Sequence, residues 1–182
     1  MDTTVLETER IRLKIITPNV VRELVETHSE QQLKEVMNLD ESGYEKLLNM
    51  YEQGMETHRI SLLYFLLIKK ESNELIGECG FHTWNKAHQR AEVFYSLKNE
   101  SDKRTGYLSE VLPVVLDFGF KTMKLHRIEA LVADWNIASV KLLLKNNFIK
   151  EGTLKEHYLV NGVFEDSDCY ALINKSKHPY TK

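Results

Sequence analysis

Two short polar segments in the second half of the chain have the composition of anion-binding helix starts. One reads Lys-Arg-Thr-Gly-Tyr over residues 103–107, and the other reads Asn-Ile-Ala-Ser over residues 136–139. Each leads into a stretch with the apolar spacing of a helix. The first backbone N–H groups of a helix have no partner within it and can bind a phosphate group. The pair therefore predicts a phosphate-bearing cofactor that lies across a sheet.

Composition limits the classes of protein to consider. The 182 residues are 42% hydrophobic and 28% charged, which is typical of a soluble globular chain, and the length fits one domain over residues 1–182. The net charge of -3 lacks the basic excess that nucleic-acid or membrane-surface binding favours. Residues 1–9 are too polar for a signal peptide, and the apolar run at 62–68 is too short to cross a bilayer. We expect a cytoplasmic protein with neither a nucleic-acid nor a membrane partner.

Hydrophobic periodicity predicts the elements that position the two segments. Strands are expected at residues 10–16, 60–68, 75–84, 90–97 and 127–132, and helices at 20–28, 29–37, 42–58, 109–123 and 138–145. Asn161-Gly162, between apolar runs, predicts a terminal hairpin over residues 148–173. Gly77 and Gly80 within one strand suggest a bulge or a close backbone approach. The order of elements indicates an α+β fold with a mixed sheet that is antiparallel at its start.

The two cysteines carry no special chemistry. Cys79 and Cys169 lie in apolar, strand-like stretches, where a buried thiol is the usual outcome. Neither metal-ligand spacing nor a disulfide framework is present, so no metal site is expected.

Four strings, in this order and spacing, resemble the GNAT superfamily of acetyl-CoA-dependent N-acetyltransferases, and most of all its Rim-type ribosomal-protein alanine N-acetyltransferases. They are Ala-Glu-Val-Phe-Tyr at 91–95, the turn and following residues at 103–110, Leu-His-Arg-Ile-Glu-Ala at 125–130, and 136–139. The resemblance implies a GNAT-like fold, in which helices flank a mixed, mostly antiparallel, splayed central sheet. It also implies transfer of an acetyl group from acetyl-CoA to an amine by direct attack in a ternary complex.

The resemblance assigns the cofactor site residue by residue. Backbone N–H groups of residues 104–108 would hold the pyrophosphate, basic side chains would add charge, and the strand edge at 95–97 would pair with the pantetheine amides. The expected cofactor residues are Tyr95, Ser96, Leu97, Lys103, Arg104, Thr105, Gly106, Tyr107, Leu108, Ser109, Asn136, Ser139 and Lys145. Asn136 would contact the pantetheine arm or cap its helix, and both can hold at once, whereas Lys145 can instead be part of a solvated basic surface.

The same resemblance implies the catalytic groups. Glu92 is expected to be the base that draws a proton from the amine through water, although a strand glutamate can also simply pair with Arg90 or Arg127. Ser139 is the candidate acid, or the hydroxyl nearest the sulfur, although a serine there can also bond to the backbone of its helix start. Glu156 is a second candidate base.

The acceptor side of the site is less specific. His82 and Trp84 are expected to line the acceptor cleft, although a tryptophan there is more often packed in the core. The acceptor expected from the resemblance is a protein N-terminal α-amine, perhaps ribosomal. A polyamine, amino acid or antibiotic is the alternative, as is a non-catalytic acetyl-CoA sensor. The terminal hairpin and edge strands also offer surfaces for a homodimer.

The chain departs from the family strings at four positions. Lys103 stands where Gln or Arg is usual, Leu108 where a small residue is usual, and Asn147 where Gly is common. Asn147 can keep the left-handed conformation that ends the helix. Leu143 stands where many members carry a tyrosine acid, so that role must be filled elsewhere or is absent.

Overall fold

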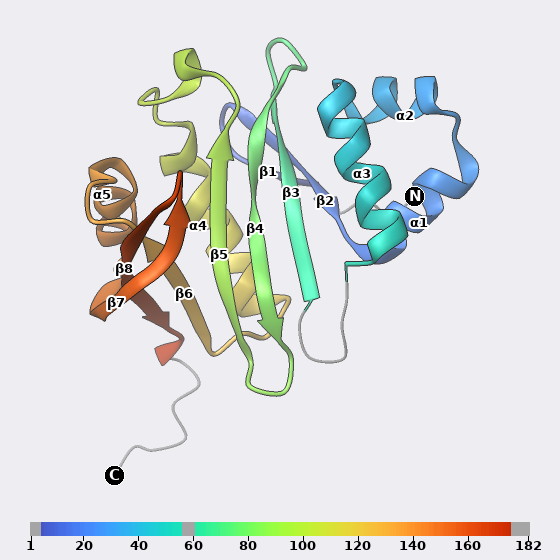
Figure 1. Ribbon diagram of the computed structural model, residues 1–182. Helices are drawn as coiled ribbons and strands as arrows, with labels where there is room; N and C mark the ends of the chain where they lie inside the picture. Colours follow the sequence, from blue (N-terminus) through green and yellow to red (C-terminus); the bar gives the residue numbers. More distant parts are fainter. Residues whose placement is uncertain (1–4, 56–60, 176–182) are drawn as a thin grey trace.

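An eight-stranded sheet forms the centre of the molecule in the computed structural model, which describes residues 5–55 and 61–175 (Figure 1). The strand order is β1-β2-β3-β4-β5-β6-β8-β7, and every neighbouring pair is antiparallel except β5 and β6. The strands are β1 (Val5–Glu7), β2 (Ile11–Ile16), β3 (Ser61–Lys69), β4 (Leu75–Asn85), β5 (Arg90–Leu97), β6 (Arg127–Val132), β7 (Ile149–Val160) and β8 (Val163–Ile173). This confirms the expected α+β class and the mixed, mostly antiparallel sheet.

Five α-helices and one short 3-10 helix accompany the sheet in the described residues. They are α1 (Pro18–Thr27), α2 (Glu30–Met37), α3 (Glu41–Gln53), the 3-10 turn Glu100–Asp102, α4 (Tyr107–Lys121) and α5 (Ile137–Lys145). The first three begin at residues whose side chains accept a backbone N–H, namely Thr17, Ser29 and Asp40. None of the helices described is long and apolar enough to span a membrane.

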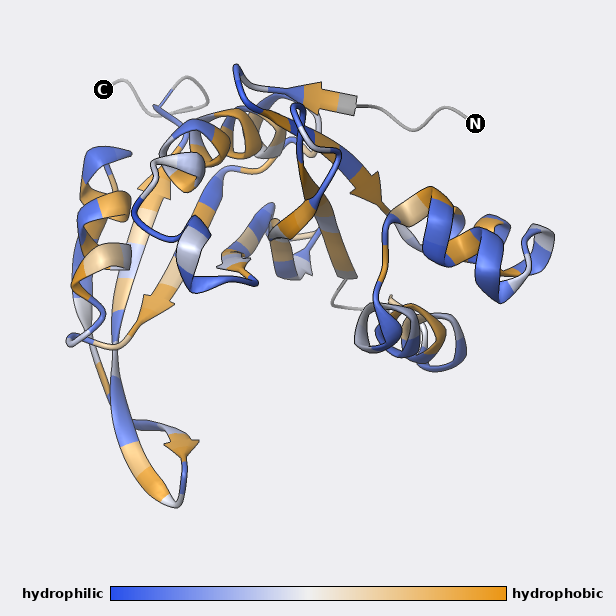
Figure 2. Ribbon diagram, turned by 90° about the horizontal axis from the view of Figure 1, so that it is seen from above, coloured by the Kyte–Doolittle hydropathy of each residue, from blue (hydrophilic) through white to orange (hydrophobic). Residues whose placement is uncertain are grey.

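The two faces of the sheet bury separate apolar cores. Along β3, Leu63, Phe65 and Leu67 pack into one core with α4, whereas Tyr64 and Leu66 pack into the other with α1–α3. This alternation follows from the two-residue period of a strand, and it explains why β3 is apolar throughout. Seen from above, α4 covers one face, and α1–α3 and the β7–β8 hairpin extend from the opposite face at its two ends (Figure 2).

Several helix boundaries differ from the sequence prediction by one or more residues, and two of the differences occur at glycines. The α3 helix ends at Gln53 and not near residue 58, because Gly54 follows with φ 79, outside the helical region; residues 56–60 lie outside the described part. The α4 helix begins at Tyr107 and not at Ser109. Its start is set by Gly106, whose φ of 93 ends the preceding loop in a left-handed conformation. The hairpin is confirmed, with Asn161 and Gly162 both left-handed at its turn.

The glycines of β4 mark a close backbone approach, as the sequence predicted. A Cβ atom on Gly80 would lie 2.3 Å from the Cα of Tyr64, its partner on β3, and 2.5 Å from the carbonyl oxygen of Leu63. These neighbours are backbone atoms in the middle of the sheet and cannot turn away.

We therefore expect Gly80→Ala to lower the free energy of unfolding by at least about 1–3 kcal/mol, because the added methyl group overpacks the β3–β4 pair. Gly152→Ala is the matched control, since a Cβ there meets nothing within 4 Å; its effect should stay within about 0.5 kcal/mol. Urea unfolding of both variants measures this. Equal stabilities would contradict the close approach.

Candidate active site

The site forms where β5 and β6 stop pairing. The parallel ladder joins Arg90–Glu92 only to Arg127–Glu129, after which β5 continues beside β4 and β6 continues beside β8. Beyond this point the two strands diverge, and backbone groups that face the gap need other partners. The sheet is thus splayed, as the sequence resemblance implied.

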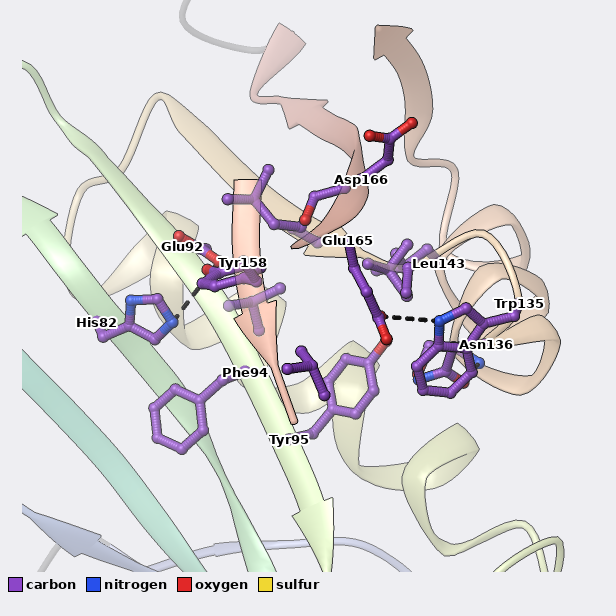
Figure 3. Close-up of a pocket in the computed structure, with 18 residues that line it drawn as sticks. His82, Glu92, Phe94, Tyr95, Trp135, Asn136, Leu143, Tyr158, Glu165 and Asp166 are labelled. Carbon is purple, nitrogen blue, oxygen red and sulfur yellow. Dashed lines mark hydrogen bonds and ion pairs between the residues drawn. The ribbon is translucent and has the colours of Figure 1, made fainter. Parts of the chain in front are cut away.

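Glu92 is the last β5 residue in this ladder, and its carboxylate lies at the point of divergence. The side chain is only 15% exposed, and it accepts a hydrogen bond from the backbone N–H of Leu131 on β6. The carboxylate therefore replaces the strand partner that Leu131 has lost. Its oxygen also lies 3.7 Å from Nε2 of His82 on β4 (Figure 3). Burial lowers the pKa of His82, which favours the neutral imidazole.

A second carboxylate faces Glu92 across the ladder. Glu129 is its direct partner on β6, and two guanidinium groups hold Glu129, from Arg90 at 2.8 Å and from Arg127 at 2.6 Å. Burial and the charge of Glu129 raise the pKa of Glu92 to about 7, against smaller opposing effects of the Leu131 N–H and of Arg90. The two carboxylates thus differ in their surroundings. The charge of Glu129 is balanced by two arginines, whereas the pKa of Glu92 lies close to neutral pH.

A pocket of about 370 Å³ occupies the gap between the diverging strands (Figure 3). Its lining comes from β4, β5, β6, the start of α5 and the β7–β8 hairpin: His82, Glu92, Val93, Phe94, Tyr95, Ala130, Leu131, Val132, Ala133, Trp135, Asn136, Ser139, Leu143, Tyr158, Val160, Glu165, Asp166 and Ser167. Three carboxylates are among these residues, and no lysine or arginine in the described chain lines the pocket. The lining therefore suits a ligand with positive charge.

A hydrogen bond ties the hairpin to the start of α5 at the mouth of this pocket. Nε1 of Trp135 donates to a carboxylate oxygen of Glu165 at 3.0 Å (Figure 3). Asp166, the next residue of β8, pairs instead with Lys155 at 2.6 Å and accepts the backbone N–H of Glu156 at 2.9 Å. Glu165 is consequently the hairpin carboxylate that faces the pocket without an ion pair among the described residues.

A second pocket, of about 150 Å³, lies at the N-terminus of α4. Its lining includes Arg104, Gly106, Tyr107, Leu108 and Ser109 from the turn and helix start, with Ala138, Ser139 and Leu142 from α5, Tyr95 from β5, and Asp102. No side chain caps this end of α4 in the described structure, so the first amides of the helix remain available to an anion.

The turn before α4 is held by residues far away in the sequence. Arg10, just before β2, forms an ion pair with Glu110, donates to the Thr105 carbonyl at 3.2 Å and stacks on the Tyr107 ring at 4.5 Å. Asp102 is buried and pairs with Lys69 at 2.7 Å. These contacts fix the two left-handed residues of the turn, Arg104 and Gly106, with φ of 63 and 93.

The two pockets meet at a pair of hydroxyl groups. Tyr95 and Ser139 line both pockets, and their side chains hydrogen bond to each other. Asn136 caps α5 by accepting the N–H of Ser139 at 3.2 Å, and it also lines the larger pocket. Both roles that the sequence suggested for Asn136 are therefore compatible with its position.

The structure brings together most of the residues predicted from sequence, but not all of them. Glu92, His82, Tyr95, Asn136 and Ser139 line the larger pocket. Arg104, Gly106, Tyr107, Leu108 and Ser109 line the smaller pocket, together with Tyr95 and Ser139. The remaining predicted residues line neither of these two pockets: Trp84, Ser96, Leu97, Lys103, Thr105, Lys145 and Glu156.

The positions of these remaining residues have local causes. Trp84 packs against the α4-side core, and Ser96 lines a separate pocket beneath α3. Lys103 pairs with Glu100, whereas Lys145 is exposed. Glu156 is exposed at an irregularity of the β7–β8 ladder, with φ 50, and Tyr158 takes the place at the pocket.

Sequence reasoning missed the residues that the hairpin and the α5 entry contribute. Because β8 returns to pair with β6, the pocket is also lined by Trp135, Tyr158, Glu165 and Asp166. The only sequence signal was the hairpin itself, which does not specify the side of the sheet that it covers. Among the described residues, no group of three or more His, Cys, Asp or Glu side chains could hold a metal ion.

Comparison with known proteins agrees with this geometry. A family profile described as "Acetyltransferase (GNAT) domain" matches residues 10–149. A protein of Bacillus subtilis (strain 168) named "Uncharacterized N-acetyltransferase YoaA" is 31% identical over 93% of this chain and 96% of its own length. A ribosomal-protein-serine acetyltransferase of Escherichia coli (strain K12) is 30% identical over 62% of each chain.

A solved structure shows the same arrangement of elements. The crystal structure of a spermidine/spermine N-acetyltransferase from Vibrio cholerae has a TM-score of 0.66 at 20% identity, covering 90% of this chain and 92% of that one. The family profile ends at the start of β7, so the hairpin wall of the larger pocket lies outside the matched span.

The raised pKa of Glu92 predicts a pH-dependent stability. An unfolded glutamate titrates near 4.5, whereas folded Glu92 keeps its proton up to about pH 7. The free energy of unfolding therefore falls between these pH values, by up to about 1.4 kcal/mol per pH unit. Glu92→Gln keeps an acceptor for the Leu131 N–H and removes the charge. We expect it to raise the free energy of unfolding by about 1–3 kcal/mol at pH 8 and to change little at pH 4.5.

Urea unfolding at the two pH values measures this difference. Glu45→Gln, on the exposed side of α3, serves as the control for the amide replacement. A Glu92→Gln variant that is less stable than wild type at pH 8 would contradict the assignment.

Proposed function

The chain belongs to the GNAT family of acetyltransferases and is an N-acetyltransferase, and we propose that it moves the acetyl group of acetyl-CoA to the N-terminal α-amine of a protein, as Rim-type enzymes do. The observation that carries the proposal is the junction of the two pockets at Tyr95 and Ser139. One pocket offers helix-start amides and Arg104, which suit phosphates, and the other offers a buried carboxylate of raised pKa, which suits an amine.

The residues at the start of α4 fit the diphosphate of coenzyme A. Backbone amides beside Gly106 provide donors, Arg104 adds charge, and the smaller pocket continues past Ser109 toward Ser139. The pantetheine arm would run from there between β5 and the start of α5, where Tyr95 and Asn136 lie. When bound, acetyl-CoA supplies the thioester whose acetyl group is transferred.

Glu92 is suited to remove the proton that the attacking amine must lose. An α-amine titrates near 8, so at neutral pH most of it is protonated, and a carboxylate with a pKa of about 7 is a matched acceptor. The larger pocket leaves room for a water molecule between carboxylate and amine. The thiols of Cys79 and Cys169 have pKa values raised by burial and do not line either pocket. These features support direct attack by the amine without a covalent enzyme intermediate.

The surroundings of the larger pocket favour a polypeptide acceptor. The β7–β8 hairpin and α1–α3 extend from the same face of the sheet, on opposite sides of β4 and β5 (Figure 2). Large apolar side chains are exposed near the hairpin tip: Leu159, Val160, Val163 and Phe164. Such side chains can contact the residues that follow an N-terminal amine, whereas a small amine would not reach them.

A polyamine is the second candidate, because the larger pocket is acidic. Glu92, Glu165 and Asp166 line it without a lysine or arginine among the described residues, and a polyamine carries several positive charges. A non-catalytic acetyl-CoA sensor remains the third reading, but the titration of Glu92 near neutral pH has no evident use in a sensor.

Cofactor binding tests the phosphate end of the proposal. Gly106→Val forces a β-branched residue into φ 93 and places its Cβ 3.3 Å from Nη2 of Arg10, which should turn the helix-start amides away from an anion. We expect the dissociation constant for coenzyme A, measured by calorimetry, to rise at least about tenfold. Gly162→Val, at φ 81 with open space around it, carries similar backbone strain at the hairpin turn and should leave the constant unchanged. Equal constants for both variants would place the phosphates elsewhere.

A panel of amines tests the transfer itself. Purified protein with acetyl-CoA is given peptides with N-terminal Ala or Ser, the same peptides with a blocked N-terminus and an internal lysine, and spermidine. We expect thiol release and gain of one acetyl group, detected by mass spectrometry, with the free N-terminal peptides. Faster release with spermidine would favour the polyamine alternative, and no release despite tight binding of acetyl-CoA would favour the sensor.

A further inference from the structure

We propose that Tyr95 is the acid that delivers a proton to the leaving sulfur of coenzyme A, and that Ser139 is its hydrogen-bond partner. This inference rests on the proposed function, because it requires a thioester in the pocket. Many family members carry a tyrosine acid where this chain has Leu143, and the sequence suggested Ser139 as the acid instead. The proposal assigns this acid role to Tyr95.

The position of Tyr95 follows from the two pockets. A ligand with its phosphates at the start of α4 and its reacting end near Glu92 must pass Tyr95 and Ser139, the only described residues that line both pockets. The Tyr95 ring points from β5 across the gap toward the start of α5 (Figure 3). The sulfur, which joins the pantetheine arm to the acetyl group, would therefore lie beside these two hydroxyl groups.

Other hydroxyl groups around the larger pocket are less suitable. Tyr158 is 48% exposed and lies on the hairpin close to Glu92; burial and the charge of Glu92 raise its pKa, so it is on the amine side of the site (Figure 3). Ser167 is held by His157 at 3.1 Å. Leu143 is fully buried and apolar. Tyr95 is the phenol that stands between the phosphate end and the amine end.

The environment of Tyr95 keeps its proton in place until it is needed. Burial raises the pKa of Tyr95, and the hydrogen bond from Ser139 partly opposes that rise. When Ser139 donates to the phenol oxygen, the Tyr95 proton stays free to point at the sulfur. The same hydrogen bond stabilises the phenolate after the proton has left.

The proposed step is balanced within the site. The electron pair of the amine forms the new C–N bond, and the C–S bond breaks with its electron pair left on sulfur. The Tyr95 O–H proton moves to that sulfur, so coenzyme A leaves as the thiol. The amine attacks in its neutral form, and the proton that its nitrogen loses on forming the amide reaches Glu92 through water. Exchange with solvent then removes that proton from Glu92 and returns a proton to Tyr95. No oxidant or reductant takes part.

Binding of coenzyme A to Tyr95→Phe tests the contact without catalysis. At pH 9, where a thiol with a pKa near 8.5 is mostly ionised, a phenol beside the sulfur should favour coenzyme A over desulfo-coenzyme A by about tenfold. We expect Tyr95→Phe to abolish this preference and to leave the affinity for desulfo-coenzyme A unchanged. A variant that loses affinity for both ligands equally would show a packing role and overturn the inference.

Turnover gives the second readout. With the best amine of the panel, Tyr95→Phe should lower kcat by about 100-fold or more, because an acid in the transition state contributes roughly that much. Tyr64→Phe is the matched control, since its hydroxyl is also buried but lies beneath α3, 3.5 Å from the Met50 sulfur; it should leave kcat unchanged. Ser139→Ala should have a smaller effect than Tyr95→Phe, because the donor itself remains.

A selenoester of coenzyme A separates acid catalysis from misfolding. A selenol is a stronger acid than a thiol, so its anion leaves with less need of a proton. The Tyr95→Phe defect should therefore shrink with acetyl-seleno-coenzyme A. An equal defect with both donors, or a wild-type rate in the variant, overturns the role of Tyr95 and leaves the proposed function standing. A wild-type protein that acetylates no amine overturns both.

Discussion

Every feature of the site depends on the divergence of β5 and β6 after the Glu92–Glu129 pair. A parallel ladder that stops in the middle of a sheet leaves backbone groups on both strands without partners, and buried groups of this kind are strongly disfavoured. Here the Glu92 carboxylate accepts the N–H of Leu131, so a side chain completes the ladder. The divergence thus creates a cavity and, at the same time, positions a carboxylate at its innermost point.

The two helices that follow β5 and β6 depend on the same divergence. The α4 helix follows β5 through the turn at Arg104 and Gly106, and α5 follows β6 through the cap at Asn136. Because the strands have separated, both helix starts lie along the gap, where a long ligand can contact them together. Arg10, before β2, fixes the turn, so the first residues of the sheet contribute to a site formed mainly by the second half of the chain.

Local pattern was sufficient to predict the helices and all strands except β1, but it did not predict the 3-10 turn or the side of the sheet that the terminal hairpin covers. The strand at 90–97, the turn at 103–107 and the cap at Asn136 were predicted because alternation, left-handed glycine and helix capping are properties of short segments. Glu156 was expected at the acceptor and is exposed, because the β7–β8 ladder is irregular between Leu154 and Tyr158. Four steps along β7 there oppose two along β8, so two extra residues bulge out of the ladder, and Glu156, with φ 50, lies in that bulge.

The contacts that complete the site join segments far apart in the sequence, and for that reason no sequence motif predicted them. Trp135 meets Glu165 only because β8 returns to lie beside β6, and Arg10 meets Glu110 only because the N-terminal strands lie over the start of α4. The sequence contains these residue types but no spacing that relates them. Their pairing follows from strand order, which local propensity does not encode.

One physical cause, burial in the gap, prepares two groups for the opposite tasks that we propose for them. Desolvation disfavours the charged form of any acid, so it raises the pKa of both Glu92 and Tyr95. For a carboxyl group, a rise to about 7 makes a base strong enough to accept a proton from an amine at neutral pH. For a phenol, the rise keeps the proton on the oxygen, ready to be donated to a thiolate. A site that needs a base and an acid at the same pH can therefore obtain both from one cavity, provided that the ordinary pKa values lie on either side of neutrality.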